Sequence, residues 1–199
     1  NNRGKVAEYR ALLKNIPYEL VTPGELGLKK EVVESGRTFE ENAGLKATAL
    51  AAESGLLTLA DDSGLEVEAL GREPGPLSAR YAGEGASDTD RIRYLLKRLE
   101  GVPWEERRAC FRCVIALAGG GERLSYFSGE CRGMVGFEPR GDSGFGYDPV
   151  FYLPELGKTM AELSFAEKNR LSHRGKAARK AARRLRSNLL RGNNRAEMR

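Results

Sequence analysis

Leu56-Leu57-Thr58-Leu59-Ala60, followed directly by Asp61-Asp62-Ser63-Gly64, is the stretch that decides the fold of this 199-residue chain. The mostly apolar run is typical of a buried β-strand, and we expect the strand to stop at the aspartate pair. Ligands of α/β proteins bind at the carboxyl edge of the sheet, where Mg²⁺ can relieve the repulsion between clustered carboxylates and bridge to phosphate oxygens. The same residues also fit an ordinary strand end with an Asx turn, and alone they favour that simpler interpretation.

Helices are expected on both sides of this stretch. Thr38 is the predicted N-cap of a helix that runs to about Ser54, with Glu41 completing a capping box and Gly55 closing the helix. Ser87 or Asp88 is expected to cap another. The remaining helices are predicted from apolar residues at three- and four-residue spacing. The expected helices cover residues 5–14, 38–54, 88–99 and 174–190.

Alternating polar and apolar residues predict several strands. We expect an antiparallel meander late in the chain, with Gly119-Gly120-Gly121 as its first hairpin, and a loop over the site at residues 72–87. The order of elements indicates an α/β fold, with an elongated, mixed, twisted sheet flanked by helices. A single domain is expected over residues 1–190, followed by a disordered basic tail at 191–199. The strand candidates cover residues 18–22, 56–60, 66–70, 109–118, 123–130 and 131–139.

Charge is distributed unevenly along the chain. Residues 1–165 carry a net charge of −5 and residues 166–199 carry +10, which gives the overall +5. A basic segment can contact nucleic acid, a membrane surface or an anionic small molecule. The segment is also rich in helix-forming residues with one apolar stripe. We therefore favour a docked terminal helix with a solvated basic face over a nucleic-acid-binding segment.

The cysteines and the hydropathy of the sequence indicate the cellular compartment in which we expect the protein. The chain has an odd number of cysteines, namely Cys110, Cys113 and Cys131. Only the first two have the spacing of a redox or zinc motif. Alternation places Phe111 and Cys113 on one face of a strand, so we interpret the cysteines as reduced structural residues of a cytoplasmic protein. The sequence has no run of 18 or more apolar residues, so no membrane span is expected.

Three further clusters carry chemistry suited to a nucleotide. Asn2-Arg-Gly-Lys5 stands at a helix entry, where free amides and a lysine can hold phosphate. The loop Gly141–Asp148 combines dense glycines with Phe145 and Tyr147, which can stack on a base. Near the basic helix, Lys168 and His173-Arg174 can donate to a carbonyl or a phosphate. Each cluster alone also fits a structural role.

Together with the aspartate pair, these clusters describe a nucleotide–Mg²⁺ site, and the sequence resembles the house-cleaning inosine/xanthosine triphosphate pyrophosphatases. Those enzymes hydrolyse deaminated purine nucleoside triphosphates (dITP, ITP, XTP) to the monophosphate and pyrophosphate. The resemblance covers roughly residues 1–186, with six motifs in family order. The matching stretches are Asn2-x-x-Lys5, Thr38-Phe-Glu-Glu-Asn-Ala43 with Lys46-Ala47, Ala60-Asp-Asp-Ser-Gly-Leu65, Pro74-Gly-Pro-x-Ser-Ala-Arg-Tyr81, Gly144-Phe-Gly-Tyr-Asp-Pro-Val-Phe151 and Ser172-His-Arg-Gly175.

The resemblance implies roles for individual residues. Asp62 would be the general base and a Mg²⁺ ligand, and Glu41 the second acidic ligand. Phe145 would stack on the purine. The resemblance also implies a homodimer and two lobes around a central substrate cleft. The other residues implied to bind substrate are Asn2, Lys5, Lys46, Ser63, Gly146, Tyr147, Asp148, Lys168, His173 and Arg174.

Two alternatives stay open at the level of sequence. A His173-Arg174 donor pair suits the six-keto group of hypoxanthine or xanthine, but a relative with another base preference, such as one for modified pyrimidines, also fits. A nucleic-acid-binding protein that uses residues 166–199 is the alternative from another class. Family members also begin with an apolar strand before the Asn motif. The sequence here starts at Asn1, so we expect that strand to be missing from it.

Overall fold

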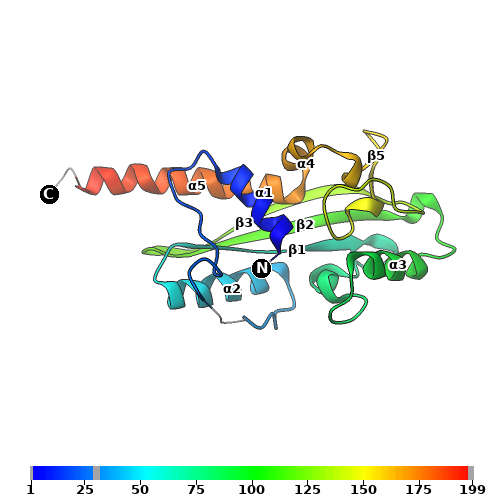
Figure 1. Ribbon diagram of the computed structural model, residues 1–199, viewed down its shortest axis with the longest axis horizontal. Coiled ribbons are helices and arrows are strands. Elements are labelled where there is room, and N and C mark those ends of the chain that lie inside the picture. The colour runs from blue at the N-terminus through cyan, green and yellow to red at the C-terminus, as the bar shows by residue number, and fades with distance from the viewer. Residues whose placement is uncertain (1, 29–31, 197–199) are drawn as a thin grey trace.

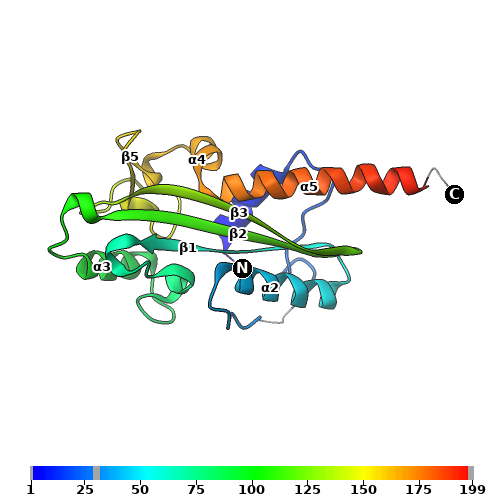
Figure 2. The same ribbon diagram turned by 180° about the vertical axis from the view of Figure 1, so that it is seen from behind.

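A five-stranded sheet runs along the molecule, with α1 and α5 on one face and α2 and α3 on the other (Figures 1 and 2). The structure is a computed structural model that describes residues 2–28 and 32–196. The strands follow the order β1-β2-β3-β4-β5. They span Thr58–Val67 (β1), Arg108–Gly119 (β2), Glu122–Val135 (β3), Phe151–Leu153 (β4) and Lys158–Thr159 (β5), and the helices span Arg3–Leu13 (α1), Phe39–Ser54 (α2), Asp88–Arg98 (α3), Phe165–Leu171 (α4) and His173–Ala196 (α5).

The α/β fold is confirmed, but the sheet differs from the prediction in four ways. All four strand pairings in the described part of the chain are antiparallel, so the expectation of a mixed sheet is wrong. The strand expected to stop at Asp61 continues to Val67, and the two strands expected at 123–130 and 131–139 are one strand, β3. Residues 18–22 form no strand. The hairpin at Gly119–Gly121 is confirmed.

β2 divides the core between the two faces of the sheet. Cys113 and Ile115 pack with the apolar side chains of α1 and α5, whereas Val114 and Ala116 pack with those of α2. This alternation follows from the two-residue period of a strand.

Local capping explains where the helices begin. Ser87 caps α3 through a complete capping box with Asp90. The predicted capping box of α2 is only half formed: Thr38 Oγ1 accepts the Glu41 N–H at 3.1 Å, but the Glu41 carboxylate accepts the N–H of Arg37, not that of Thr38. Gly55 closes α2 in the left-handed conformation, as expected (φ 70°).

α5 packs on the sheet through an apolar stripe, and its basic side chains add hydrogen bonds to neighbouring backbone carbonyls. Lys176 and Lys180 donate to the Glu130 and Ser128 carbonyls of β3, and Arg179 donates to the carbonyls of Asn169 and Arg170. These contacts support the docked helix over the nucleic-acid-binding segment. The helix extends to Ala196, into the expected tail, and residues 197–199 lie outside the described residues. Among the described residues, no helix has the length and apolar character needed to cross a membrane.

Candidate active site

Asp61 and Asp62 lie side by side on β1 but point to opposite faces of the sheet. Asp61 pairs in register with Ile115 and Asp62 with Val114, whose side chains pack toward α5 and α2 respectively. Two adjacent carboxylates in a strand therefore occupy different environments. The division of labour between them, which the sequence leaves open, follows from those environments.

On the α2 face, Asp62 belongs to a small polar cluster. Lys46 Nζ lies 3.1 Å from Asp62 Oδ1 and 3.0 Å from Glu34 Oε1, so one ammonium group holds two carboxylates. The Asn42 amide donates to Asp62 Oδ2 at 3.2 Å. Burial raises the pKa of Asp62, and the nearby Lys46 only partly offsets this effect. Asp62 is therefore a better proton acceptor than an ordinary aspartate.

Glu41 does not reach this cluster through any hydrogen bond or ion pair in the described part of the chain. Its carboxylate accepts the Arg37 N–H at 2.6 Å at the start of α2. Glu34 stands beside Asp62 instead, in a segment that Arg80 fixes by donating to the Glu34 carbonyl at 3.1 Å. The second carboxylate near Asp62 is therefore Glu34.

On the opposite face, Asp61 is surrounded by cations. Lys5 Nζ lies 3.0 Å from Asp61 Oδ2, Arg174 Nε lies 3.7 Å from the same oxygen, and the Ser63 hydroxyl donates to it at 3.2 Å. Burial alone would raise the pKa of Asp61, but Lys5 and Arg174 together hold it well below its usual range. Asp61 stays ionised and anchors Lys5. Asn2 Oδ1 accepts the Lys5 N–H at 3.1 Å and so caps α1.

A buried carboxylate connects the cations on this face. Glu8, on α1, accepts from Lys168 Nζ at 2.8 Å and from Arg174 Nη1 at 2.6 Å, and only 3% of its side chain is exposed. Lys168 also contacts Asp148 Oδ2 at 2.5 Å, and Arg174 Nη2 donates to Ser63 Oγ at 2.8 Å. Asp148, Lys168, Glu8 and Arg174 thus form a continuous chain of alternating charge, which Arg174 extends to Asp61 and Lys5.

The glycine-aromatic loop brings Phe145 to the same place. Its ring lies over Lys168 Nζ, 4.5 Å from the centroid, and 5.3 Å from Arg174 Cζ. A Cβ added at Gly4 would lie 2.5 Å from the ring, so a larger residue at position 4 would displace Phe145. Phe145 is only half-buried, which suits a stacking surface.

Two other residues of the loop have structural partners. Tyr147 is buried, and its hydroxyl donates to the Ser78 carbonyl at 2.9 Å. The Gly146 N–H donates to Asp88 Oδ2 at 2.6 Å. These residues hold the loop in place and present Phe145.

His173 is buried beside this chain of charges. Its ring stacks on Phe111, with centroids 4.7 Å apart, and its Nδ1 atom has no hydrogen-bond partner among the described residues. Burial, reinforced by Arg174, holds the pKa of His173 well below its usual range, so the ring is neutral at neutral pH. A neutral imidazole offers one N–H donor rather than two.

The Asp62 cluster on one face of the sheet and the cations around Asp61 on the other face meet at the outer edge of β1. Within the described residues β1 pairs only with β2, apart from a single bridge between Glu66 and Pro74. Asp61 and Asp62 lie on the part of the strand without an outer neighbour. One molecule passing over this edge can contact the oxygen-rich Asp62 cluster and the cationic side with Phe145.

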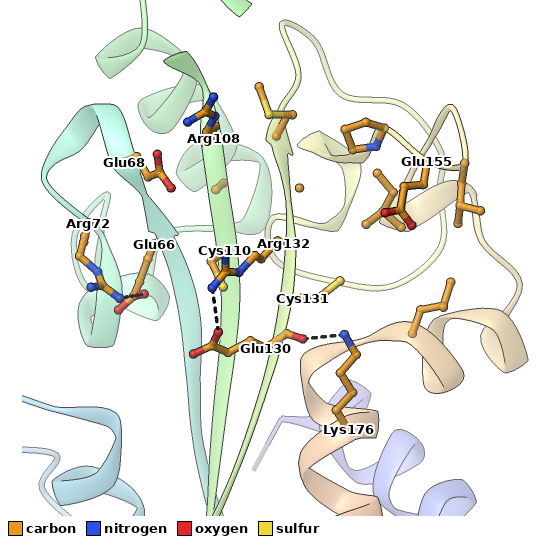
Figure 3. Close-up of a pocket in the computed structure, with 17 residues that line it drawn as sticks. Glu66, Glu68, Arg72, Arg108, Cys110, Glu130, Cys131, Arg132, Glu155 and Lys176 are labelled. Atoms are coloured by element: carbon orange, nitrogen blue, oxygen red, sulfur yellow. Dashed lines mark hydrogen bonds and ion pairs between the residues drawn. The ribbon is translucent and has the colours of Figure 1, made fainter. Parts of the chain in front are cut away.

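A cavity of about 1110 Å³ lies elsewhere. It opens over β2 and β3 and is lined by alternating charges that include Glu66, Arg72, Glu130 and Arg132 (Figure 3). None of the predicted site residues is among the described residues that line it. Volume alone is therefore a poor guide to the chemistry of this chain.

Four residues of the site escape sequence reasoning. Asn42 lies inside the motif Thr38–Ala43 without a predicted role, and Glu34 lies just before that motif; Asn42 acts on Asp62 of β1 and Glu34 on Lys46 of α2. Glu8 lies three residues after Lys5, on the same side of α1, and this spacing is the only local signal for it. The sequence predicts Asp88 as a possible helix cap, but its carboxylate accepts the N–H of Gly146 in a distant loop.

Comparison with known proteins places the chain in a family. The Ham1 family model matches residues 1–184. A dITP/XTP pyrophosphatase of Desulforamulus reducens is 52% identical over 181 residues, covering 91% of this chain and 90% of the relative, and one of Geobacter sulfurreducens is 51% identical, covering 88% of each. The structure of a HAM1 protein from Coxiella burnetii has a TM-score of 0.86 at 41% identity, covering 94% of this chain and 95% of that protein. The chain belongs to the Ham1 family.

Proposed function

We propose that this protein hydrolyses deaminated purine nucleoside triphosphates, namely dITP, ITP and XTP, to the monophosphate and pyrophosphate. Water adds across the anhydride that joins the α- and β-phosphates, and the proton passes to a base. The observation that carries the proposal is the contrast between Asp61 and Asp62. Their surroundings shift the two pKa values in opposite directions, which is how one site obtains an anchor and a base from two carboxylates. The relatives named dITP/XTP pyrophosphatase support the reaction class.

In this proposal, Asp62 accepts the proton of the attacking water. In the metal-free site burial raises the pKa of Asp62, and Asn42 keeps its carboxylate oriented. Lys46 stays positively charged despite its burial, because Asp62 and the other nearby carboxylates raise its pKa. Lys46 and Lys5 bind phosphate oxygens and offset the negative charge that develops during the attack.

The Asp62 cluster also fits a magnesium ion. Mg²⁺ in phosphate-binding sites uses one or two carboxylates and takes its remaining oxygen ligands from water and phosphate. Asp62 and Glu34 supply two carboxylates that already converge on one cation, Lys46. We assign the second acidic ligand to Glu34 rather than Glu41 for this reason. When bound, the metal would polarise the phosphate oxygens and neutralise their charge.

The purine would lie on Phe145 at the cationic end of the site. Ser63, Lys168 and Arg174 stand around this end, and the neutral His173 offers a single N–H. A six-keto base places an acceptor among these donors, whereas adenine places an amino group there and leaves donors unpaired. Asp148 completes this end by holding Lys168 and the Phe145 N–H.

The deciding experiment measures pyrophosphate release from ITP, XTP, ATP and GTP, with Mg²⁺ and with EDTA. We expect fast release from ITP and XTP that requires Mg²⁺, and little from ATP and GTP. Asp62→Asn should lower kcat by at least about a hundredfold while nucleotide binding stays measurable. Glu34→Gln should raise the Mg²⁺ concentration needed for half-maximal rate, and Glu41→Gln should not. Equal rates with EDTA and with Mg²⁺ would refute the metal assignment.

We further propose that the protein acts in the cytoplasm as a homodimer. The cavity over β2 and β3 carries both signs of charge in alternation, the pattern of a self-complementary surface (Figure 3). Light scattering coupled to size-exclusion chromatography should give a dimeric mass. Arg132→Glu should shift that mass toward the monomer if this surface forms the contact, and an unchanged dimer would place the contact elsewhere.

A further inference from the structure

The loop that carries Phe145 is held by a segment of the chain that contributes no other residue to the site. Asp88, the first residue of α3, accepts the Gly146 N–H at 2.6 Å, and Tyr147 donates to the Ser78 carbonyl at 2.9 Å. Gly146 directly follows Phe145. The position of the aromatic ring therefore depends on where α3 holds Asp88.

Asp88 is itself fixed by Arg91, one turn along the same helix. The second carboxylate oxygen of Asp88 pairs with the Arg91 guanidinium, which also donates to the Ala79 carbonyl at 3.0 Å and to the carbonyl of Ala86. Only 17% of the Arg91 side chain is exposed. The partly exposed carboxylate is thus oriented toward Gly146 by the half-buried guanidinium of Arg91.

The Asp88 carboxylate is not needed to begin the helix. Ser87 caps α3, and the reciprocal contact comes from Asp90, whose carboxylate accepts the Ser87 N–H at 3.2 Å. Helix capping and loop attachment are therefore performed by different acidic residues two positions apart. This separation provides a matched control.

The opposite side of Phe145 is already constrained. The ring contacts the first turn of α1 at Gly4 and lies over Lys168, and the Phe145 N–H donates to Asp148 at 2.9 Å. The bond from Gly146 to Asp88 holds the loop from the other side. Loss of that bond lets the loop move away from α1, while the phosphate-binding lysines on α1 and α2 stay in place.

We infer that Asp88 is a positioning residue for base recognition: its carboxylate fixes the Gly146 backbone and thereby the stacking face of Phe145, without contacting the nucleotide. The inference rests on the proposed function and adds a specificity determinant outside its motifs. Asp88 should therefore affect affinity for the base but not the chemical step or the binding of phosphate.

The test compares Asp88→Ala, Asp88→Asn and the control Asp90→Ala. For each purified protein we would measure kcat and KM for ITP, the inhibition constant of inorganic tripolyphosphate (which has no base), and the melting temperature. Asp88→Ala should raise KM about tenfold, because one charge-assisted hydrogen bond of a partly exposed group is lost. Its kcat and its tripolyphosphate inhibition should stay within about twofold of wild type. Asp88→Asn should restore part of the affinity, because the amide oxygen can still accept from Gly146.

Asp90→Ala should lower the melting temperature and leave KM unchanged. Equal KM values for Asp88→Ala and wild type would overturn the inference, as would a parallel loss of tripolyphosphate binding or the same KM change in both alanine variants. If the wild-type protein hydrolyses no nucleotide, the proposed function fails separately. Calorimetric titration with inosine monophosphate then decides the role of Asp88: about tenfold weaker binding by Asp88→Ala supports it, and equal binding refutes it.

Discussion

Replacing Glu8 with glutamine removes the negative charge that joins the two cations at the base end of the site. Glu8, Asp61 and Asp148 face Lys5, Lys168 and Arg174, so three negative charges balance three positive ones. The variant leaves an excess positive charge in a region where the Lys168 and Arg174 side chains are 4% and 2% exposed. Glutamine keeps the size of the side chain, but its NH₂ group would face Lys168 or Arg174, and both of these side chains are hydrogen-bond donors.

The expected cost is large because the pair is buried. Removing one partner of a buried ion pair destabilises a protein by roughly 3–5 kcal/mol. At about 2–4 °C for each kcal/mol in a domain of this size, the melting temperature should fall by roughly 6–20 °C. The exposed pair between Arg10 and Glu25 offers a matched control, since both side chains are about half exposed and the N···O distance is also 2.6 Å. Glu25→Gln should leave the stability unchanged within error.

The assay is urea denaturation followed by the fluorescence of Trp104, the only tryptophan of the chain. The free energy of unfolding should fall by the stated amount in Glu8→Gln with an unchanged m-value. A Glu8→Gln transition that coincides with those of wild type and Glu25→Gln would refute the reasoning. It would show that the buried charges rearrange at little cost.

Three further predictions concern single side chains. Gly4→Ala should weaken binding of inosine monophosphate several-fold with little change in folding, because the added Cβ would lie 2.5 Å from the Phe145 ring; unchanged binding by calorimetry would contradict the contact. His173 is held neutral by burial and by Arg174, so the unfolded chain binds an extra proton below about pH 6.5 and stability should fall as the pH drops through that value. Denaturation at pH 7.5 and 5.5 should show a flatter pH dependence for His173→Gln than for wild type, and parallel slopes would contradict it. Arg107→Met should destabilise the fold by about 3 kcal/mol or more, because the buried guanidinium donates to the backbone carbonyls of Leu99, Val102, Val135 and Gly136, and a melting temperature equal to that of wild type would refute it.

The local elements could be predicted because their causes are local. Ser87 and Thr38 mark the starts of two helices through hydroxyls that accept nearby N–H groups, and Gly55 marks an end by adopting positive φ. Strand limits were less predictable. The strand was expected to stop at Asp61, but β1 continues because its next residues alternate between a buried apolar face and a polar face, as at Leu65 and Glu66.

Residues 123–139 were expected to form two strands, but a nonlocal requirement makes β3 continuous. β3 continues through Gly129 and Gly133, residues that usually weaken a strand. A Cβ at Gly129 would lie 2.2 Å from the His173 carbonyl oxygen, and one at Gly133 would lie 2.4 Å from that of Tyr152. These glycines permit close backbone approach by a helix and a neighbouring strand. Only the folded chain reveals that requirement.

By itself, the sequence determined the α/β class, the helix caps, and the set of acidic, basic and aromatic residues suited to a nucleotide. These properties depend on residue type and short spacing, so they can be read along the chain. The tertiary structure alone decided which charges meet. Glu8 and Arg174 are 166 positions apart and in direct contact, and Glu34, not Glu41, stands beside Asp62. The pKa values of Asp61 and Asp62 diverge for the same reason, because burial and neighbouring charge are set by packing between distant elements.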